Sequence, residues 1–179
     1  MPGENQTEVL ILPFRWEDWE ALWQLRDHQL QELGISPDPN PNQSDLSSPY
    51  EQDYHRLDQV YQKDNGNFWI ARLGKFPVGH IGAQDMETHI ELRRMYVRKE
   101  YRRLGVGTQL VQTLIDHCCA NNVNVIELWT DAQGPGRFLY EKLGICEVKN
   151  NEAENRTVSY QPLKQVGFTG HFIIEKRWN

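Results

Sequence analysis

The spacing of hydrophobic residues alternates between short apolar runs and helical periodicity along the chain. Short apolar runs predict strands over residues 8–12, 68–73 and 78–84. Gly74 and Lys75 separate the last two runs, so these strands are expected to form a hairpin. The first half of the chain is therefore expected to contain three strands.

Apolar residues recur with helical spacing in four segments. They predict helices over residues 16–33, about 49–63, 106–120 and 134–143. Gly34 and Gly144 follow the first and last of these segments and are expected to end them, as Asn121 and Asn122 are for the third.

The strand expected over residues 89–97 contains an irregularity. Ile90 and Leu92 share one face by the two-residue period, but Met95 and Val97 fall on the other. An extra residue at Arg93 and Arg94, a β-bulge, would return all four apolar side chains to one face. A strand buried on both faces beyond residue 94 would explain the pattern equally well.

The order of elements indicates how the sheet is connected. A further strand over residues 123–129 completes a β-α-β unit over residues 89–129, whose two strands should be parallel with a right-handed crossover. Two last strands are expected over residues 145–148 and 172–176. The polar segments 36–49 and 150–167 read as loops within a single domain covering residues 1–179.

Composition excludes several classes of protein. With 39% hydrophobic and 25% charged residues, the chain resembles ordinary soluble proteins, and neither a membrane span nor a signal peptide is expected from its apolar runs. Three cysteines give no disulfide framework, which favours the cytoplasm, and the six histidines lack ligand spacing, so no metal is expected. The net charge of -6 argues against binding to nucleic acid.

One short segment opposes the acidic balance of the chain. Residues 93–103 carry six Arg and Lys residues against the single acid Glu100, directly before a predicted helix. Cations are unfavourable at a helix N-terminus, so an anion bound there, most simply a phosphate group, would explain them. A solvated run of charges is the alternative.

Two glycines begin the helix that follows the basic segment. Gly105 and Gly107 would allow the backbone to approach a ligand closely. The segment has neither the lysine of a P-loop nor the third glycine of a dinucleotide-binding turn. A different phosphate-bearing ligand is therefore expected.

Two motifs resemble the GNAT acetyltransferase superfamily, the Gcn5-related N-acetyltransferases. Residues 102–107, Arg-Arg-Leu-Gly-Val-Gly, are similar to the acyl-CoA loop [QR]-x-x-G-x-[GA], and residues 139–145, Leu-Tyr-Glu-Lys-Leu-Gly-Ile, to the later segment L-Y-E-K-x-G-F. The resemblance implies an α/β (α+β) fold, with a mixed, mostly antiparallel sheet of six to seven strands. A central parallel β-α-β unit and about four flanking helices belong to that fold.

The same resemblance implies transfer of an acetyl group from acetyl-CoA to an amine. The residues expected to bind the cofactor are those of the strand and loop together with one polar residue before the last helix: Met95, Tyr96, Val97, Arg102, Arg103, Leu104, Gly105, Val106, Gly107, Thr108 and Gln133. Gln133 stands where the family often has Asn, which changes the reach of that contact to the pantetheine arm.

Two residues are expected to transfer protons. Tyr140 would protonate the leaving thiolate, and Glu91, four residues before Met95, would act as the base through water, with Asp85 in reserve. Tyr140 could instead only pack its helix onto the sheet, and Glu91 could be a carboxylate ion-paired to Arg93.

An acyl-CoA-binding sensor without catalysis is the alternative function. The acceptor amine stays open, although acidic residues in and after segment 36–49 would suit a cation. Because the family often forms dimers, a homodimer is among the assemblies that the resemblance implies.

Overall fold

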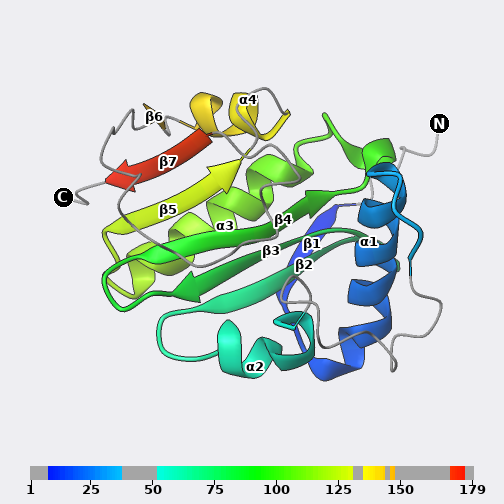
Figure 1. Ribbon diagram of the computed structural model, residues 1–179, viewed down its shortest axis with the longest axis horizontal. Coiled ribbons are helices and arrows are strands. Elements are labelled where there is room, and N and C mark those ends of the chain that lie inside the picture. The colour runs from blue at the N-terminus through cyan, green and yellow to red at the C-terminus, as the bar shows by residue number, and fades with distance from the viewer. Residues whose placement is uncertain (1–7, 38–51, 131–134, 144–145, 148–169, 176–179) are drawn as a thin grey trace, which may run out of the picture.

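A seven-stranded mixed sheet organises the protein (Figure 1). The computed structural model describes residues 8–37, 52–130, 135–143, 146–147 and 170–175. Its strands lie in the order β1-β2-β3-β4-β5-β7-β6, and only β4 and β5 pair in parallel. Their bounds are β1 Val9–Pro13, β2 Asn67–Leu73, β3 Phe76–Asp85, β4 Ile90–Val97, β5 Val125–Thr130, β6 Cys146–Glu147 and β7 Gly170–Glu175. The predicted fold, with its hairpin and parallel β-α-β unit, is confirmed.

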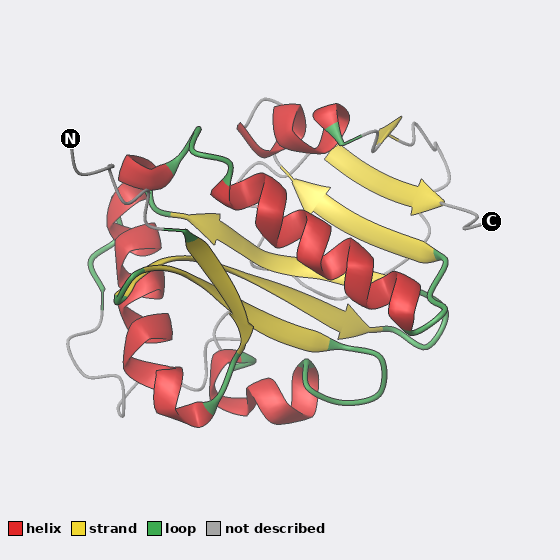
Figure 2. Ribbon diagram, turned by 180° about the vertical axis from the view of Figure 1, so that it is seen from behind, coloured by secondary structure: helices red, strands yellow, loops and turns green. Residues whose placement is uncertain are grey.

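Helices cover both faces of the sheet, and α3 lies across the face that Figure 2 turns to the viewer. The α-helices are α1 Trp19–Glu32, α2 Leu57–Val60, α3 Val106–Ala120 and α4 Pro135–Lys142. Short 3₁₀ turns precede three elements, at η1 Trp16–Asp18, η2 Tyr54–Arg56 and η3 Lys99–Tyr101. Three of the four predicted helices agree with the structure within a few residues.

The helix predicted over residues 49–63 is wrong in extent. Within the described residues of that segment, a 3₁₀ turn precedes a single α-helical turn that ends at Val60. The backbone breaks between them at Arg56, with φ -138° and ψ 40°. The apolar spacing was nevertheless informative, because Tyr54, Leu57 and Tyr61 are all buried.

The two faces of the sheet have separate hydrophobic cores. The α3 face, which α4 also covers, is largely aliphatic and contains Ile90 and Leu92 of β4. The opposite face, beneath α1 and α2, is largely aromatic and contains Tyr96 of the same strand. Strand β4 thus contributes to both cores.

The predicted bulge in β4 is confirmed. Along the β3 ladder, Gly82 faces Arg93 and His80 faces Tyr96, so two residues of β4 lie opposite Ile81. Arg94, one of the two, has φ +53°. Beyond it, Met95 and Val97 pack against the aliphatic core, as the shift in apolar phase predicted.

Strands β4 and β5 separate where the bulge begins. Their parallel pairing covers Ile90 with Ile126, Glu91 with Glu127 and Leu92 with Leu128, and then stops. The two ribbons diverge beyond this point (Figure 1). The last part of β4 therefore pairs only with β3 among the described strands, and its β5 side is an open strand edge.

Candidate functional site

The first turn of α3 leaves backbone N–H groups that no bond within the helix occupies. The first bond within the helix joins the Gln109 N–H to the Gly105 carbonyl at 3.0 Å. The N–H groups of Val106, Gly107 and Thr108 therefore have no partner within the helix, and no side chain caps this end. Such an end, with the positive pole of the helix dipole, is suited to bind phosphate oxygens.

Left-handed backbone shapes the loop before α3. Gly105 has φ +83° and Arg103 has φ +64°. Glycine adopts such a value without strain, whereas arginine does so at a cost. The loop thus turns sharply between η3 and α3, with residues 102–105 exposed.

Gly107 has a role in packing, and the ligand approach that the sequence suggested there stays a prediction. A Cβ atom there would lie 3.2 Å from the Leu139 Cδ2 of α4 and 3.3 Å from the Met95 Cε of β4. The lack of a side chain lets the start of α3 lie close to both elements.

Most of the basic residues before α3 are neutralised by acids. Arg93 pairs with Glu91, Arg94 with Asp53, and Arg98 more loosely with Glu100. Asp53 is distant in sequence, so counting neighbouring residues overstated the local charge. Within the described residues, ion pairs are found for all of the segment's cations except Lys99 and Arg103.

Arg102 is held by the last residue of α1. Its guanidinium pairs with the Glu32 carboxylate through Nη2, and its Nε donates to the Val97 carbonyl at 2.9 Å. Glu32 also accepts a hydrogen bond from the Tyr96 hydroxyl at 2.7 Å. The exposed Arg103 is therefore the more available cation for a phosphate group.

Tyr140 lies at the end of β5 where the two strands have separated. A Cβ atom on Gly136, in the first turn of α4, would lie 2.9 Å from the Thr130 Oγ1 of β5 and 3.4 Å from the Tyr140 Cε2. The Tyr140 side chain is buried in the aliphatic core, and this burial raises the pKa of its phenol. The residue accordingly carries its proton at neutral pH.

Glu91 lies beside the open edge of β4, on the face opposite α3. It alternates with Ile90 and Leu92, whose side chains enter the aliphatic core. The Arg93 Nε lies 3.0 Å from the Glu91 Oε1, and the Arg93 Nη1 donates to the Gln84 Oε1 at 2.8 Å. The ion pair weighed in the sequence analysis is present, and it fixes the direction of the carboxylate.

Asp85 serves as a turn residue at the end of β3. Its carboxylate accepts hydrogen bonds from the backbone N–H groups of Asn65 at 3.0 Å and Glu87 at 2.7 Å. Burial alone would raise the pKa of Asp85, but these bonds outweigh it and lower the pKa. Because its carboxylate already accepts these hydrogen bonds, Asp85 is a weaker candidate base than Glu91.

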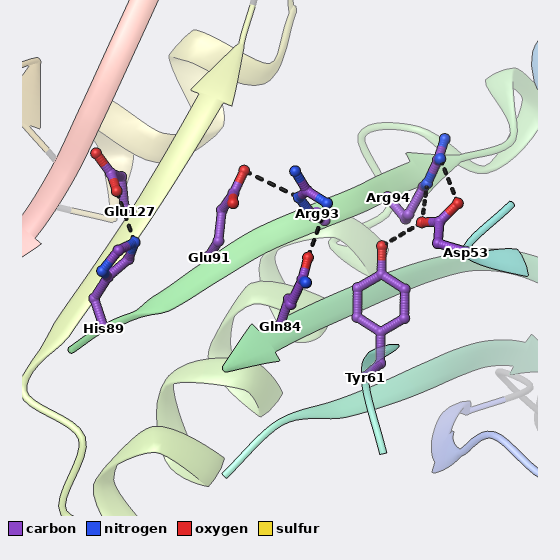
Figure 3. A network of polar contacts seen from close by, with 8 residues as sticks. All are labelled: Asp53, Tyr61, Gln84, His89, Glu91, Arg93, Arg94 and Glu127. Atoms are coloured by element: carbon purple, nitrogen blue, oxygen red, sulfur yellow. Dashed lines mark hydrogen bonds and ion pairs between the residues drawn. The ribbon is translucent and has the colours of Figure 1, made fainter. Parts of the chain in front are cut away.

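A second carboxylate on this face was not foreseen. Glu127 of β5 lies opposite Glu91 in the parallel ladder, and the His89 Nε2 lies 2.8 Å from the Glu127 Oε2 (Figure 3). Alternation along the two strands would have placed both carboxylates on one face, but only with knowledge of the register between the strands.

Asp53 and its partners were not foreseen either. The Asp53 carboxylate binds the Arg94 guanidinium and the Tyr61 hydroxyl, as Figure 3 shows. A buried Arg in a strand signals an acidic partner, but not which one. Gln133, predicted to contact the pantetheine arm, lies outside the described residues.

The chain matches the model of the acetyltransferase (GNAT) family over residues 16–145. It is 36% identical over 85 residues to a probable N-acetyltransferase camello from Xenopus tropicalis, covering 45% of this chain and 39% of that protein. It is 33% identical over 119 residues to an N-acetylaspartate synthetase from Danio rerio, covering 63% of this chain and 42% of that protein. The match thus spans about two fifths of the length of either relative.

Solved structures share the fold. An acetyltransferase of the GNAT family from Staphylococcus aureus superposes with a TM-score of 0.72 and 23% identity, covering 93% of this chain and 98% of that one. The PaiA N-acetyltransferase from Thermoplasma acidophilum, in complex with coenzyme A, superposes with a TM-score of 0.65 and 16% identity, covering 94% of this chain and 99% of that one. Among the described residues, no helix is both long and apolar enough to cross a bilayer.

Proposed function

Because the chain belongs to the GNAT acetyltransferase family, we propose that it transfers the acetyl group of acetyl-CoA to a primary amine of a small molecule or peptide. The observation that carries the proposal is the contiguity of two features. The unpaired N–H groups at the start of α3 lie next to the open edge of β4, with Gly107 packed against Met95. A ligand with a diphosphate and an extended arm suits both.

The cofactor is proposed to lie along β4. The diphosphate binds the N–H groups of residues 103–108, with added charge from Arg103. The arm then runs beside residues 95–97, hydrogen-bonding to the β5 side of the strand as an added strand would. The coenzyme A complex of the Thermoplasma relative supports a nucleotide-bearing ligand of this kind.

The chemistry is a direct displacement on the thioester. Glu91 accepts a proton from the ammonium group through water, and the free amine attacks the carbonyl carbon. The C–N bond forms, the tetrahedral oxyanion is stabilised by a backbone N–H beside the bulge, and the C–S bond then breaks. The leaving thiolate takes the Tyr140 proton, and the second proton of the attacking nitrogen passes through solvent to the Tyr140 phenoxide, which leaves a neutral amide, free coenzyme A and the restored phenol.

The state of Tyr140 fits a general acid that acts late. Its raised pKa keeps the proton on the phenol until the sulfur needs it. Proton transfer from an ordinary phenol to a thiolate is already uphill by about 2 kcal/mol, and burial adds to this cost. The transfer must therefore accompany cleavage of the C–S bond.

The amine acceptor is supported by the relatives, whose names describe N-acetyltransferases or an N-acetylaspartate synthetase. Glu91 and Glu127, which share one face beside the divergence of the strands, would favour a cationic acceptor. A cytoplasmic location and a homodimer remain predictions from the sequence.

Thiol release from acetyl-CoA in the presence of a panel of amines tests the function. We expect turnover with at least one amine, and a loss of kcat of about 100-fold or more in Tyr140→Phe. Glu141→Gln, an exposed neighbour on α4, is the matched control and should retain activity. Tight binding of coenzyme A without turnover on any amine would identify an acyl-CoA sensor instead.

A further inference from the structure

Arg94 has an unusual backbone for a residue within a strand. Its φ of +53° lies in the left-handed region, which residues other than glycine adopt only at a cost in free energy. It occupies the bulge at which β4 leaves β5. Something must hold the residue there.

The Arg94 side chain is held by acidic and aromatic partners. The Nη2 and Nε atoms donate to the two Asp53 oxygens at 2.6 and 2.8 Å. The guanidinium carbon lies 4.6 Å from the centre of the Tyr54 ring. Both charged side chains are largely buried, with exposed fractions of 13% and 12%.

Asp53 is itself anchored from a third element. The Tyr61 hydroxyl, just after α2, donates to the Asp53 Oδ2 at 2.6 Å. The carboxylate thus joins the segment before η2, the end of α2 and the bulge of β4 in one network (Figure 3). A two-point, buried contact of this kind restricts the guanidinium in both position and direction.

We propose that Asp53 and Arg94 are a positioning pair that holds the bulge of β4 in the conformation required to bind the thioester carbonyl. This inference rests on the proposed function, because the backbone beyond the bulge is where the acyl group would lie. Neither side chain reaches the reacting atoms in this account. They act through the backbone of residues 94–96.

The location of the pair favours positioning over general stabilisation. Among the described residues, no hydrogen bond or ion pair joins Asp53 to the start of α3, so loss of the pair should leave binding of the diphosphate intact. Strained backbone in sheets also concentrates at functional sites, where the surrounding structure holds it in place. The proposed effect is therefore on acyl transfer, not on cofactor capture.

Two double variants test the proposal. Asp53→Asn with Arg94→Ala removes both charges and leaves a residue that disfavours φ +53°. Asp53→Asn with Arg94→Gly removes the same charges but leaves a residue that adopts this conformation freely. Because both pairs of substitutions avoid an unpaired buried charge, each should fold, and circular dichroism below the melting temperature checks this.

We expect the alanine double variant to lose kcat by about 10- to 100-fold, as small misplacements near a reacting group do. Its dissociation constant for coenzyme A, measured by calorimetry, should change by less than about threefold, since the diphosphate site is separate. The kcat of the glycine double variant should be at least about fivefold higher than that of the alanine double variant, because glycine needs no side-chain restraint to keep the bulge.

Equal kcat values per folded molecule in the two double variants would overturn the proposal and leave the pair a purely structural role. Failure of the proposed function gives a different result, namely no turnover by the unmodified protein. In that case, calorimetry with acetyl-CoA and coenzyme A decides. The alanine double variant should lose the preference for acetyl-CoA over coenzyme A, and the glycine double variant should keep it. An equal preference in the two variants would contradict the inference.

Discussion

The two faces of the sheet are built from different chemistry. The α3 face is filled by aliphatic side chains such as Leu110 and Leu114, which need only the right size. The α1 and α2 face is aromatic and includes the fully buried His80 next to the Asp53–Arg94 pair. The difference teaches that packing on the first face depends mainly on side-chain size, whereas packing on the second also depends on specific polar partners and on pH.

The largest effect should come from the aliphatic face. Leu110 is fully buried, so Leu110→Ala should lower the free energy of unfolding by about 2 to 5 kcal/mol through lost burial and a cavity. Urea titration measures this change. The loss should be the same at pH 8 and pH 5, because no titrating group is removed, and a loss that varied with pH would break the comparison.

The aromatic face should make stability depend on pH through His80. Burial lowers the pKa of His80 to about 3, despite the nearby backbone of Arg94, and no hydrogen-bond partner for either ring nitrogen is found within the described residues. The unfolded chain binds a proton near the ordinary histidine pKa, so it gains protons first as the pH falls. The stabilisation is complete above about pH 6.5 and is lost progressively below it, by about 2 kcal/mol at pH 5.

Urea titrations across this range check the His80 prediction. His80→Phe, which replaces the ring among aromatic neighbours, should flatten the profile between pH 8 and pH 5. Leu110→Ala should keep the slope of the unmodified protein. An unchanged slope in His80→Phe would assign the pH dependence to other groups.

Tyr61→Phe should have a smaller effect. It removes the hydrogen bond to the Asp53 carboxylate but leaves the ion pair with Arg94, so the free energy of unfolding should fall by about 1 to 2 kcal/mol. Burial alone would raise the pKa of Asp53, but Arg94 and Tyr61 outweigh it and lower the pKa. Thermal unfolding at neutral pH measures the change, and no change at all would show that Tyr61 only fills space.

The smallest effect is expected at the surface of α4. The Glu141 carboxylate pairs with Arg137 one helical turn away at 2.7 Å, with an exposed fraction of 43%. Glu141→Gln should change the free energy of unfolding by less than about 0.5 kcal/mol, and added salt should reduce even that. A loss as large as that of Tyr61→Phe would remove the distinction between exposed and buried pairs.

The sequence predicted the aliphatic face far better than the aromatic one. The spacing of Val106, Leu110 and Leu114 set the inward face of α3, and the phase shift after Leu92 located the bulge. Both are local patterns that backbone periodicity imposes. The glycine-led start of α3 followed from the same patterns.

The polar contacts could not be predicted, because they join residues far apart in sequence. Arg94 and Asp53 are 41 positions apart, and Arg102 and Glu32 are 70 apart. Local charge therefore suggested a large cationic patch where the folded chain has mostly paired charges. The extent of the helix at η2–α2 was wrong for a related reason, since the backbone there is set by tertiary packing and not by helical propensity.

The early end of the β4–β5 ladder has a mechanical consequence. Among the described residues, three residue pairs join β4 to β5, so strands β5, β7 and β6 are paired with the rest of the sheet over a short length. A molecule bound along the free edge of β4 would lie between the two strands. It would make hydrogen bonds in the place of those that the strands do not make to each other. Occupancy should then slow hydrogen–deuterium exchange on both sides of the gap, and the protein would tighten around its own substrate.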